Sequence, residues 1–254
     1  MSTRPWVLAE SHWPTVREAR YEVVVLPWGA TEAHNTHLPY ATDVVEASEV
    51  AIAAAELAWK RGGRVVVLPP VPFGVNTGQR GVPYCLNLNP TTQLAVLRDL
   101  LQAIEPHGAR KFVIVNGHGG NDFKPLIREL QPHTPLFLSC INWWTVLDAS
   151  RYFAEPGDHA GALETSAMLH LAPSQVRALS EAGRGEARRF RIAALREGWA
   201  WAQRDWPSVT DDTGVGNPAG STAAQGERFV RDAEEKIAGY FTELAAADPA
   251  ALYE

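Results

Sequence analysis

Four short apolar runs, rich in β-branched residues, punctuate the first part of the chain. They are Tyr21–Leu26, Arg64–Leu68, Lys111–Val115 and Pro135–Ile141. Continuous apolar runs of this length are typical of strands that are buried on both faces of a sheet. The pattern therefore predicts four buried strands.

Between these runs, apolar residues recur at helical spacing. The spacing predicts helices over 43–60, 91–105 and 121–130; Gly62 and Gly63 end the first, and Pro106 ends the second. Strands that alternate with helices favour a mostly parallel sheet with helices on both faces. The fold class is therefore α/β, and its ligand site is expected beyond the carboxyl ends of the strands.

The second part of the chain gives a weaker pattern. Residues 161–171 and 222–247 have helical periodicity, and the long tract 181–206, rich in Arg and Trp, is helical in composition. Residues 208–220 are expected to form a loop. Because no repeat, low-complexity tract or linker interrupts the chain, we expect one domain over residues 1–254.

Composition narrows the function classes. The 254 residues are 46% hydrophobic and 20% charged, as in globular proteins with a sizeable core. The net charge of −6 argues against nucleic acid and anionic membranes as partners, even with the Arg-rich tract, which we expect to be an oligomer interface or a solvated helix. Two cysteines without paired spacing, and no apolar stretch long enough for a membrane span, favour a soluble, cytoplasmic protein.

Candidate metal ligands follow the first strand. The segment Gly29–Asp43 contains Glu32, His34, His37 and Asp43. Residues two apart in an extended segment point the same way, so Glu32 and His34 can face one site. Asp43, at the start of the next predicted helix, can turn back toward them.

A second candidate segment, Asn116–Asn121 with the sequence NGHGGN, follows the third strand and contains His118. Two loops at neighbouring strand ends can converge, and carboxylates mixed with imidazoles suit zinc, manganese or iron. A carboxylate such as Asp43 could bridge two ions, and hydrolysis by a metal-activated water is the natural chemistry.

Plainer explanations exist for each piece. Asp43 could cap its helix, and the glycine-rich turn could be only a tight turn. That turn lacks the spacing of a dinucleotide-binding or P-loop motif, and no GxSxG motif supports a serine esterase. The coincidence of these groups at strand ends favours the metal site.

The chain resembles the creatininase (creatinine amidohydrolase) family in four segments that occur in the family's order. They are PWGATEAHNTHLPYATD (27–43), NGHGGN (116–121), GDHAGALETS (157–166) and, more faintly, GVGNPAGSTAAQG (214–226). The resemblance implies a three-layer α/β/α sandwich with a mostly parallel central sheet. It also implies a homo-oligomer, often a hexamer, and a two-metal site that hydrolyses C–N bonds other than ordinary peptide bonds.

The resemblance assigns roles to these residues. It implies two divalent metal ions per subunit: Glu32 and His118 hold one ion, His34 holds the other, and Asp43 bridges them. It leads to the hypothesis that a hydroxide between the two ions attacks the carbonyl carbon of the substrate.

One ligand departs from the family pattern. Creatininase has a glutamate two residues after the histidine that matches His118, where this chain has Gly120. We expect Glu164 to supply the missing ligand, with a structural hydrogen bond as the alternative. By resemblance, His159 protonates the leaving nitrogen and Asp158 orients it. For His37 we favour a role in packing or in supporting the ligands, with direct metal binding as the alternative.

Substrate contacts are predicted from position. Asn35 lies between the histidines of the first segment, and Asn76 and Gln79 belong to a loop, residues 73–89, that is a plausible pocket wall. Trp144 could stack on a flat ring, although Trp pairs such as 143–144 are more often core or subunit packing. Because this loop departs from creatininase's own, creatinine is not assumed to be the substrate.

These observations predict a metal-dependent amidohydrolase that acts on a small, cyclic amide or formamide. The enzymatic alternatives are a formamide deformylase of pterin or flavin biosynthesis and a peptidase that trims a modified peptide. An alternative from another class is a metal-containing subunit that binds or assembles without turnover.

Overall fold

A four-stranded parallel sheet forms the centre of the computed structural model, which describes residues 4–253. Its strands are β1 (Val23–Trp28), β2 (Val65–Val67), β3 (Lys111–Asn116) and β4 (Phe137–Asn142). Their order is β2-β1-β3-β4, and Val23 of β1 lies opposite both Val65 and Lys111. The four predicted strands are therefore confirmed, within a few residues at their ends.

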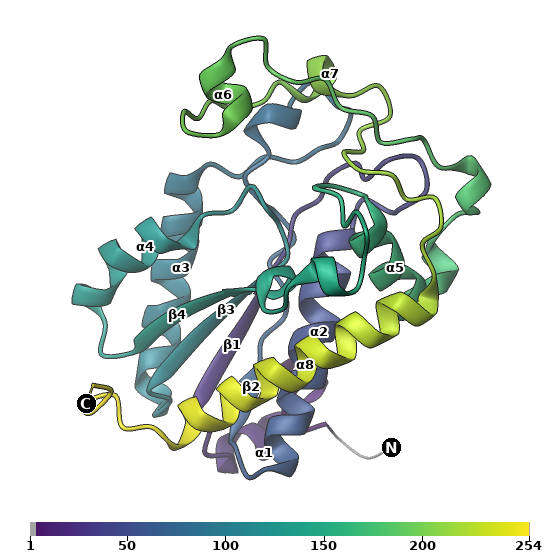
Figure 1. Ribbon diagram of the computed structural model, residues 1–254. Helices are drawn as coiled ribbons and strands as arrows, with labels where there is room; N and C mark the ends of the chain where they lie inside the picture. Colours follow the sequence, from purple (N-terminus) through teal and green to yellow (C-terminus); the bar gives the residue numbers. More distant parts are fainter. Residues whose placement is uncertain (1–3, 254) are drawn as a thin grey trace.

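Helices cover both faces of this sheet (Figure 1). The α-helices of the described residues are α1 (Trp13–Glu18), α2 (Thr42–Lys60), α3 (Pro90–Ile104), α4 (Phe123–Leu130), α5 (Ala162–Leu171), α6 (Ala193–Glu197), α7 (Trp206–Val209) and α8 (Ala223–Ala246). Of these, α6 and α7 lie away from the sheet. In addition, α8 packs along both α2 and α5.

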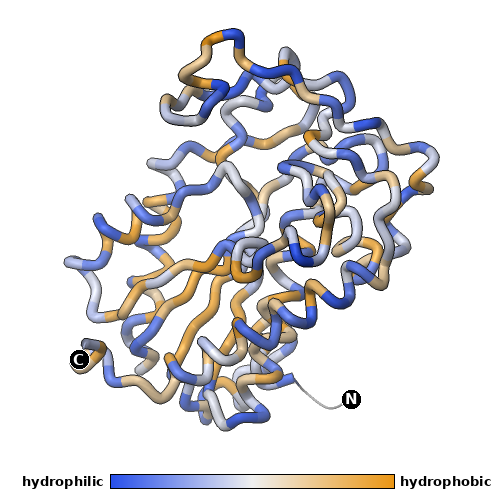
Figure 2. Tube along the Cα trace, viewed as in Figure 1, coloured by the Kyte–Doolittle hydropathy of each residue, from blue (hydrophilic) through white to orange (hydrophobic). Residues whose placement is uncertain are grey.

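Alternate residues of each strand enter two separate cores. Val23 and Val25 pack in the core that contains α2, α5 and α8, whereas Val24 and Leu26 pack in the core that contains α3 and α4. Figure 2 shows the resulting run of hydrophobic strands between helices with mixed outer faces. This double burial explains the continuous apolar runs in the sequence and confirms the three-layer α/β prediction.

The helical prediction for residues 181–206 is wrong. Within that tract only α6 and the first residue of α7 are α-helical, and the rest is irregular apart from Glu181, which ends a 3-10 turn. Gly185 and Gly198 adopt positive φ angles of 65° and 84°, and Ala187 pairs with Thr210 in an isolated bridge. Left-handed glycines and pairing to a distant segment override the local helix propensity.

The ends of the predicted domain, residues 1–3 and 254, lie outside the part of the chain that the structure describes. Among residues 4–253, no helix combines the length and the hydrophobicity that crossing a bilayer requires.

The contact between α5 and α8 gives a test of the packing. A Cβ at Gly226 of α8 would collide with the Ser166 carbonyl of α5, whereas a Cβ at Gly239 of the same helix meets nothing within 4 Å. We expect Gly226→Ala to lower the free energy of unfolding by about 1–3 kcal/mol, because overpacking forces the helices apart. Urea denaturation followed by circular dichroism measures this change.

The matched control, Gly239→Ala, should leave stability unchanged or raise it by up to about 1 kcal/mol, since alanine is the better helix former. Equal effects of the two substitutions would contradict this packing.

Candidate metal centre

Side chains from four segments converge beyond the carboxyl ends of β1 and β3. They are Glu32 and His34 after β1, Asp43 in the first turn of α2, His118 after β3, His159 just before α5, and Glu164 inside α5. Their ligand atoms form three overlapping groups, each within 4.8 Å: Glu32–Asp43–His118, His34–Asp43–Glu164 and Glu32–His34–His159. The structure thus brings together all five predicted metal ligands and His159.

The Asp43 carboxylate belongs to two of these groups. Its Oδ1 lies 2.9 Å from Nε2 of His34, and its Oδ2 lies 3.1 Å from Nδ1 of His118. Asp43 does not cap its helix, because α2 begins after Ala41 and has no side-chain cap. Its two oxygens therefore both face the cluster, one beside His34 and the other beside His118.

Each of the three histidines is held through one ring nitrogen by a backbone carbonyl. The pairs are His34 Nδ1 with Glu32 O at 3.1 Å, His118 Nε2 with Val75 O at 3.1 Å, and His159 Nε2 with Ala33 O at 2.8 Å. When such a ring binds a metal ion, the N–H that donates to the carbonyl leaves the other nitrogen with a lone pair for the ion. In all three rings that second nitrogen lies within 4 Å of a carboxylate oxygen, the arrangement of neutral histidine ligands.

Negative charge dominates the cluster. Burial opposes a charged His34 ring, but Asp43, with Glu164 and Glu32, outweighs it and raises the pKa of His34 to about 10. For His118, Glu32 and Asp43 outweigh burial in the same way and hold its pKa well above the usual value. These carboxylates draw protons onto the neighbouring imidazoles. A divalent cation suits such a site because it can neutralise the same negative charge in place of the protons.

Glu46 is a further buried carboxylate that the sequence analysis missed. It lines the same cavity, and its Oε1 has no hydrogen-bond partner among the described residues. Burial, then Glu164 and Asp43, raise its pKa well above the usual value. Its spacing of three residues from Asp43, which puts both on one face of α2, is the signal that could have identified it.

Two predicted roles do not match the geometry. Asp158 does not orient His159: its carboxylate pairs with Arg204 at 2.7 Å, and the Ala33 carbonyl holds the His159 ring instead. Asn35 does not present its amide to the cluster, because that amide is bonded to both backbone groups of Gly183. Both side chains tie neighbouring loops together.

His37 follows the packing prediction. Its Nε2 lies 2.9 Å from Oγ1 of Thr165 on α5, and burial, together with the nearby His34, lowers its pKa to about 4. The neutral ring thus joins the loop after β1 to α5.

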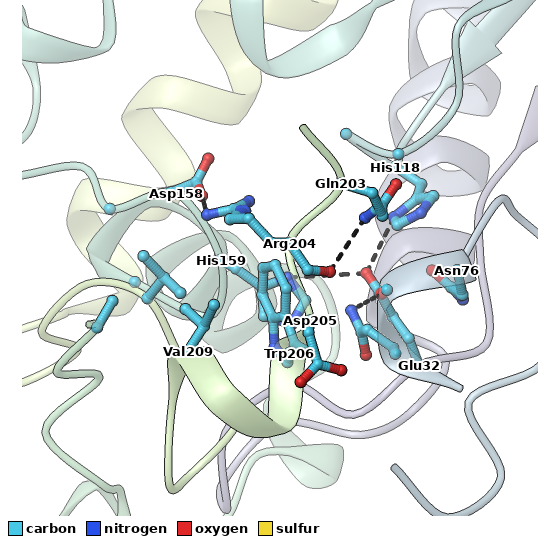
Figure 3. A pocket seen from close by; sticks show the side chains of 18 of the residues that line it. Glu32, Asn76, His118, Asp158, His159, Gln203, Arg204, Asp205, Trp206 and Val209 are labelled. Carbon is cyan, nitrogen blue, oxygen red and sulfur yellow. Dashed lines mark hydrogen bonds and ion pairs between the residues drawn. The ribbon is translucent and has the colours of Figure 1, made fainter. Parts of the chain in front are cut away.

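The cluster lies at the floor of a cavity of about 1270 Å³. Three predicted substrate contacts, Asn76, Gln79 and Trp144, line this cavity, and Gln79 donates from Nε2 to the Glu32 carboxylate. Figure 3 shows Trp206 beside His159, with ring centroids 5.3 Å apart and an interplanar angle of 86°. Trp206 is a further wall residue that sequence reasoning did not find.

A parallel α/β sheet with paired carboxylates and histidines at its strand ends defines a metallohydrolase-like site. Residues 9–241 match the family described as creatininase, creatinine amidohydrolase. The chain belongs to the creatininase family. Members of this family hydrolyse amide C–N bonds, and the protein is an enzyme of that class.

Individual relatives support this membership. A mycofactocin precursor peptide peptidase from Mycolicibacterium smegmatis is 30% identical over 82% of this chain and 79% of its own. The creatinine amidohydrolase of Pseudomonas putida is 29% identical over 61% of this chain and 66% of its own.

Solved structures agree in fold. A Bacteroides fragilis structure, provisionally assigned as a creatinine amidohydrolase, is 46% identical with a TM-score of 0.93 over the whole of both chains. A creatininase crystal structure is 21% identical with a TM-score of 0.77 over 96% of this chain and 99% of its own.

Gly120 explains why the creatininase-type glutamate does not fit here. A Cβ at this position would collide with Nε2 of His118 and with the Val75 carbonyl, the two partners that fix the His118 ring. Any side chain at position 120 therefore competes with this anchor. Glu164 reaches the cluster from α5 instead, and its Oε2 lies 3.9 Å from Nε2 of His34.

Gly120→Ala should therefore displace the His118 ring and reduce bound metal to about half or less of the wild-type content. Elemental analysis after equilibration with Zn or Mn measures this. The matched control is Gly119→Ala, since a Cβ at Gly119 meets nothing within 4 Å. Equal metal content in the two variants would count against the role of the His118 anchor.

Metal uptake should also depend on pH. The raised pKa values mean that His34 and His118 carry protons at neutral pH without an ion, and binding must release them. Affinity should therefore rise with pH until it approaches about 10, the pKa of His34. Calorimetry in buffers of different ionisation enthalpy should detect released protons, and binding without proton release would contradict this assignment.

Proposed function

We propose that the protein is a two-metal amidohydrolase. Glu32, Asp43 and His118 hold one divalent ion, and His34, Asp43 and Glu164 hold the other. The observation that carries this proposal is the division of the Asp43 carboxylate, one oxygen beside each histidine, at 2.9 and 3.1 Å.

Zinc, manganese or iron bound there would act as a Lewis acid that activates water and polarises the scissile carbonyl. The donor set of carboxylates and neutral imidazoles suits all three metals. Solved creatininases include a zinc–zinc form and a manganese form, which supports the same choice here.

His159 is the proposed proton donor to the leaving nitrogen. Its Nε2 is occupied by the Ala33 carbonyl, so Nδ1, 3.7 Å from Oε1 of Glu32, is the atom that would accept a proton from the attacking water and pass it to the leaving nitrogen. The ring packs against His34 at a tilt of 35° with centroids 4.1 Å apart, and it meets the Trp206 ring in a T-shaped contact. These two contacts fix the direction in which Nδ1 points.

The substrate is a molecule with an amide that reaches the cavity floor. A small cyclic amide or formamide is one candidate, with Asn76, Gln79 and Trp144 as contacts. The end of a peptide is the second candidate. It is favoured by the cavity of about 1270 Å³, above the roughly 300–1000 Å³ of most small-molecule sites, and by the named peptidase relatives. A homo-oligomer of single-domain subunits remains part of the proposal.

Two variants separate metal binding from proton transfer. Glu32→Gln should lose metal and activity together, whereas His159→Asn should keep about two ions per chain and lose roughly 10²–10⁴-fold in kcat. The measurements are elemental analysis and a hydrolysis screen over cyclic ureas, lactams, formamides and short peptides. Glu129→Gln, an exposed carboxylate on α4, is the control.

Turnover by a metal-free Glu32→Ala, His118→Ala double variant would rule out the proposal. A stable wild-type protein without metal and without turnover on any of these substrates would favour the binding or assembly role.

A further inference from the structure

A long segment after α5, residues 187–206, forms part of the cavity wall; we call it the arginine strap. It is fastened at both ends by ion pairs, from Arg188 to Asp211 at 2.6 Å and from Arg204 to Asp158 at 2.7 Å. The second pair is visible in Figure 3. The Arg204 guanidinium also lies over the Trp206 ring, 4.4 Å from its centroid. The strap is therefore held in place over the metal centre.

Two arginines between these anchors have no such partner. Arg189 and Arg191 both line the cavity, and within residues 4–253 neither side chain makes an ion pair or a hydrogen bond. They are two residues apart outside any helix, so their side chains can face the same side. Arg196 differs, because its guanidinium is bonded to the carbonyls of Phe190 and Arg191.

The charge of the surroundings makes these two guanidiniums distinctive. The chain has a net charge of −6, and the cavity floor contains four carboxylates, so a positive wall is a local feature of this cavity. Guanidinium groups recognise carboxylate and phosphate by paired N–H donors. Phe190 and the exposed Trp201 also line this cavity.

We propose that Arg189 and Arg191 bind an anionic group, a carboxylate or a phosphate, at the end of the substrate remote from the scissile amide. The position of the amide rests on the proposed function; the anion site itself does not. The substrate class is then an anionic amide whose charged end contacts the strap while its amide lies at the metal centre.

Calorimetric titration with matched probes tests this proposal. The probes are N-acetyl-alanyl-alanine as the free acid and as its C-terminal amide, which differ only in the anionic end. Wild-type protein should bind the acid roughly tenfold more tightly than the amide, since one charge-assisted contact is worth about that factor. An Arg189→Gln, Arg191→Gln double variant should bind the two equally.

Arg98→Gln is the matched control, an exposed arginine on α3 that faces Glu129, and it should preserve the preference. Inorganic phosphate distinguishes the two anion sources: displacement of the acid shows that the site takes phosphate, and failure to displace it assigns the site to carboxylates. Equal binding of acid and amide by the wild type, binding of neither probe, or a preference that survives in the double variant would overturn the proposal.

Metal analysis keeps the two proposals separate. The double variant should contain as much metal as the wild type. A wild type that discriminates acid from amide but contains no metal would refute the proposed function and leave the anion site standing. A metal-loaded wild type that binds acid and amide equally would refute the anion site and leave the proposed function standing.

Discussion

One shared carboxylate organises the centre of this molecule. Asp43 places an oxygen beside each of two histidines that come from different strand ends. That requires the first turn of α2 to lie directly against the loop after β3. Gly117 permits it, because a Cβ there would collide with the Asp43 carbonyl. The position of Asp43 between the two histidines therefore depends on three features together: the parallel sheet, the start of α2 and Gly117.

Most of the fold and the centre of the site could be predicted from sequence because they follow local rules. Buried strands leave continuous apolar runs, and the carboxyl ends of neighbouring parallel strands meet at one edge. Glu32, His34 and His118 follow such strands, so their proximity was foreseeable. The creatininase resemblance added Glu164 and His159, which lie far away in the chain.

What could not be predicted depends on contacts between distant segments. The arginine strap has a helical composition, but the left-handed Gly198 and the pairing of Ala187 with Thr210 after α7 give it an irregular path. Asp158 was assigned to His159 by sequence proximity, whereas Arg204 takes its carboxylate. The burial of Glu46 arises only when α2 packs against α5 and the sheet.

The carbonyl acceptors of the three histidines have an evolutionary consequence. Ala33 and Val75 contribute their main chain, so other residues at these positions can keep the same ring orientation. The path of the backbone therefore determines which ring nitrogen of each histidine carries the hydrogen. The type of residue that supplies the carbonyl does not matter, so the sequence alone does not reveal this role. Relatives with little identity can preserve this centre, while an insertion or a proline that shifts the loop would destroy it without changing a single ligand.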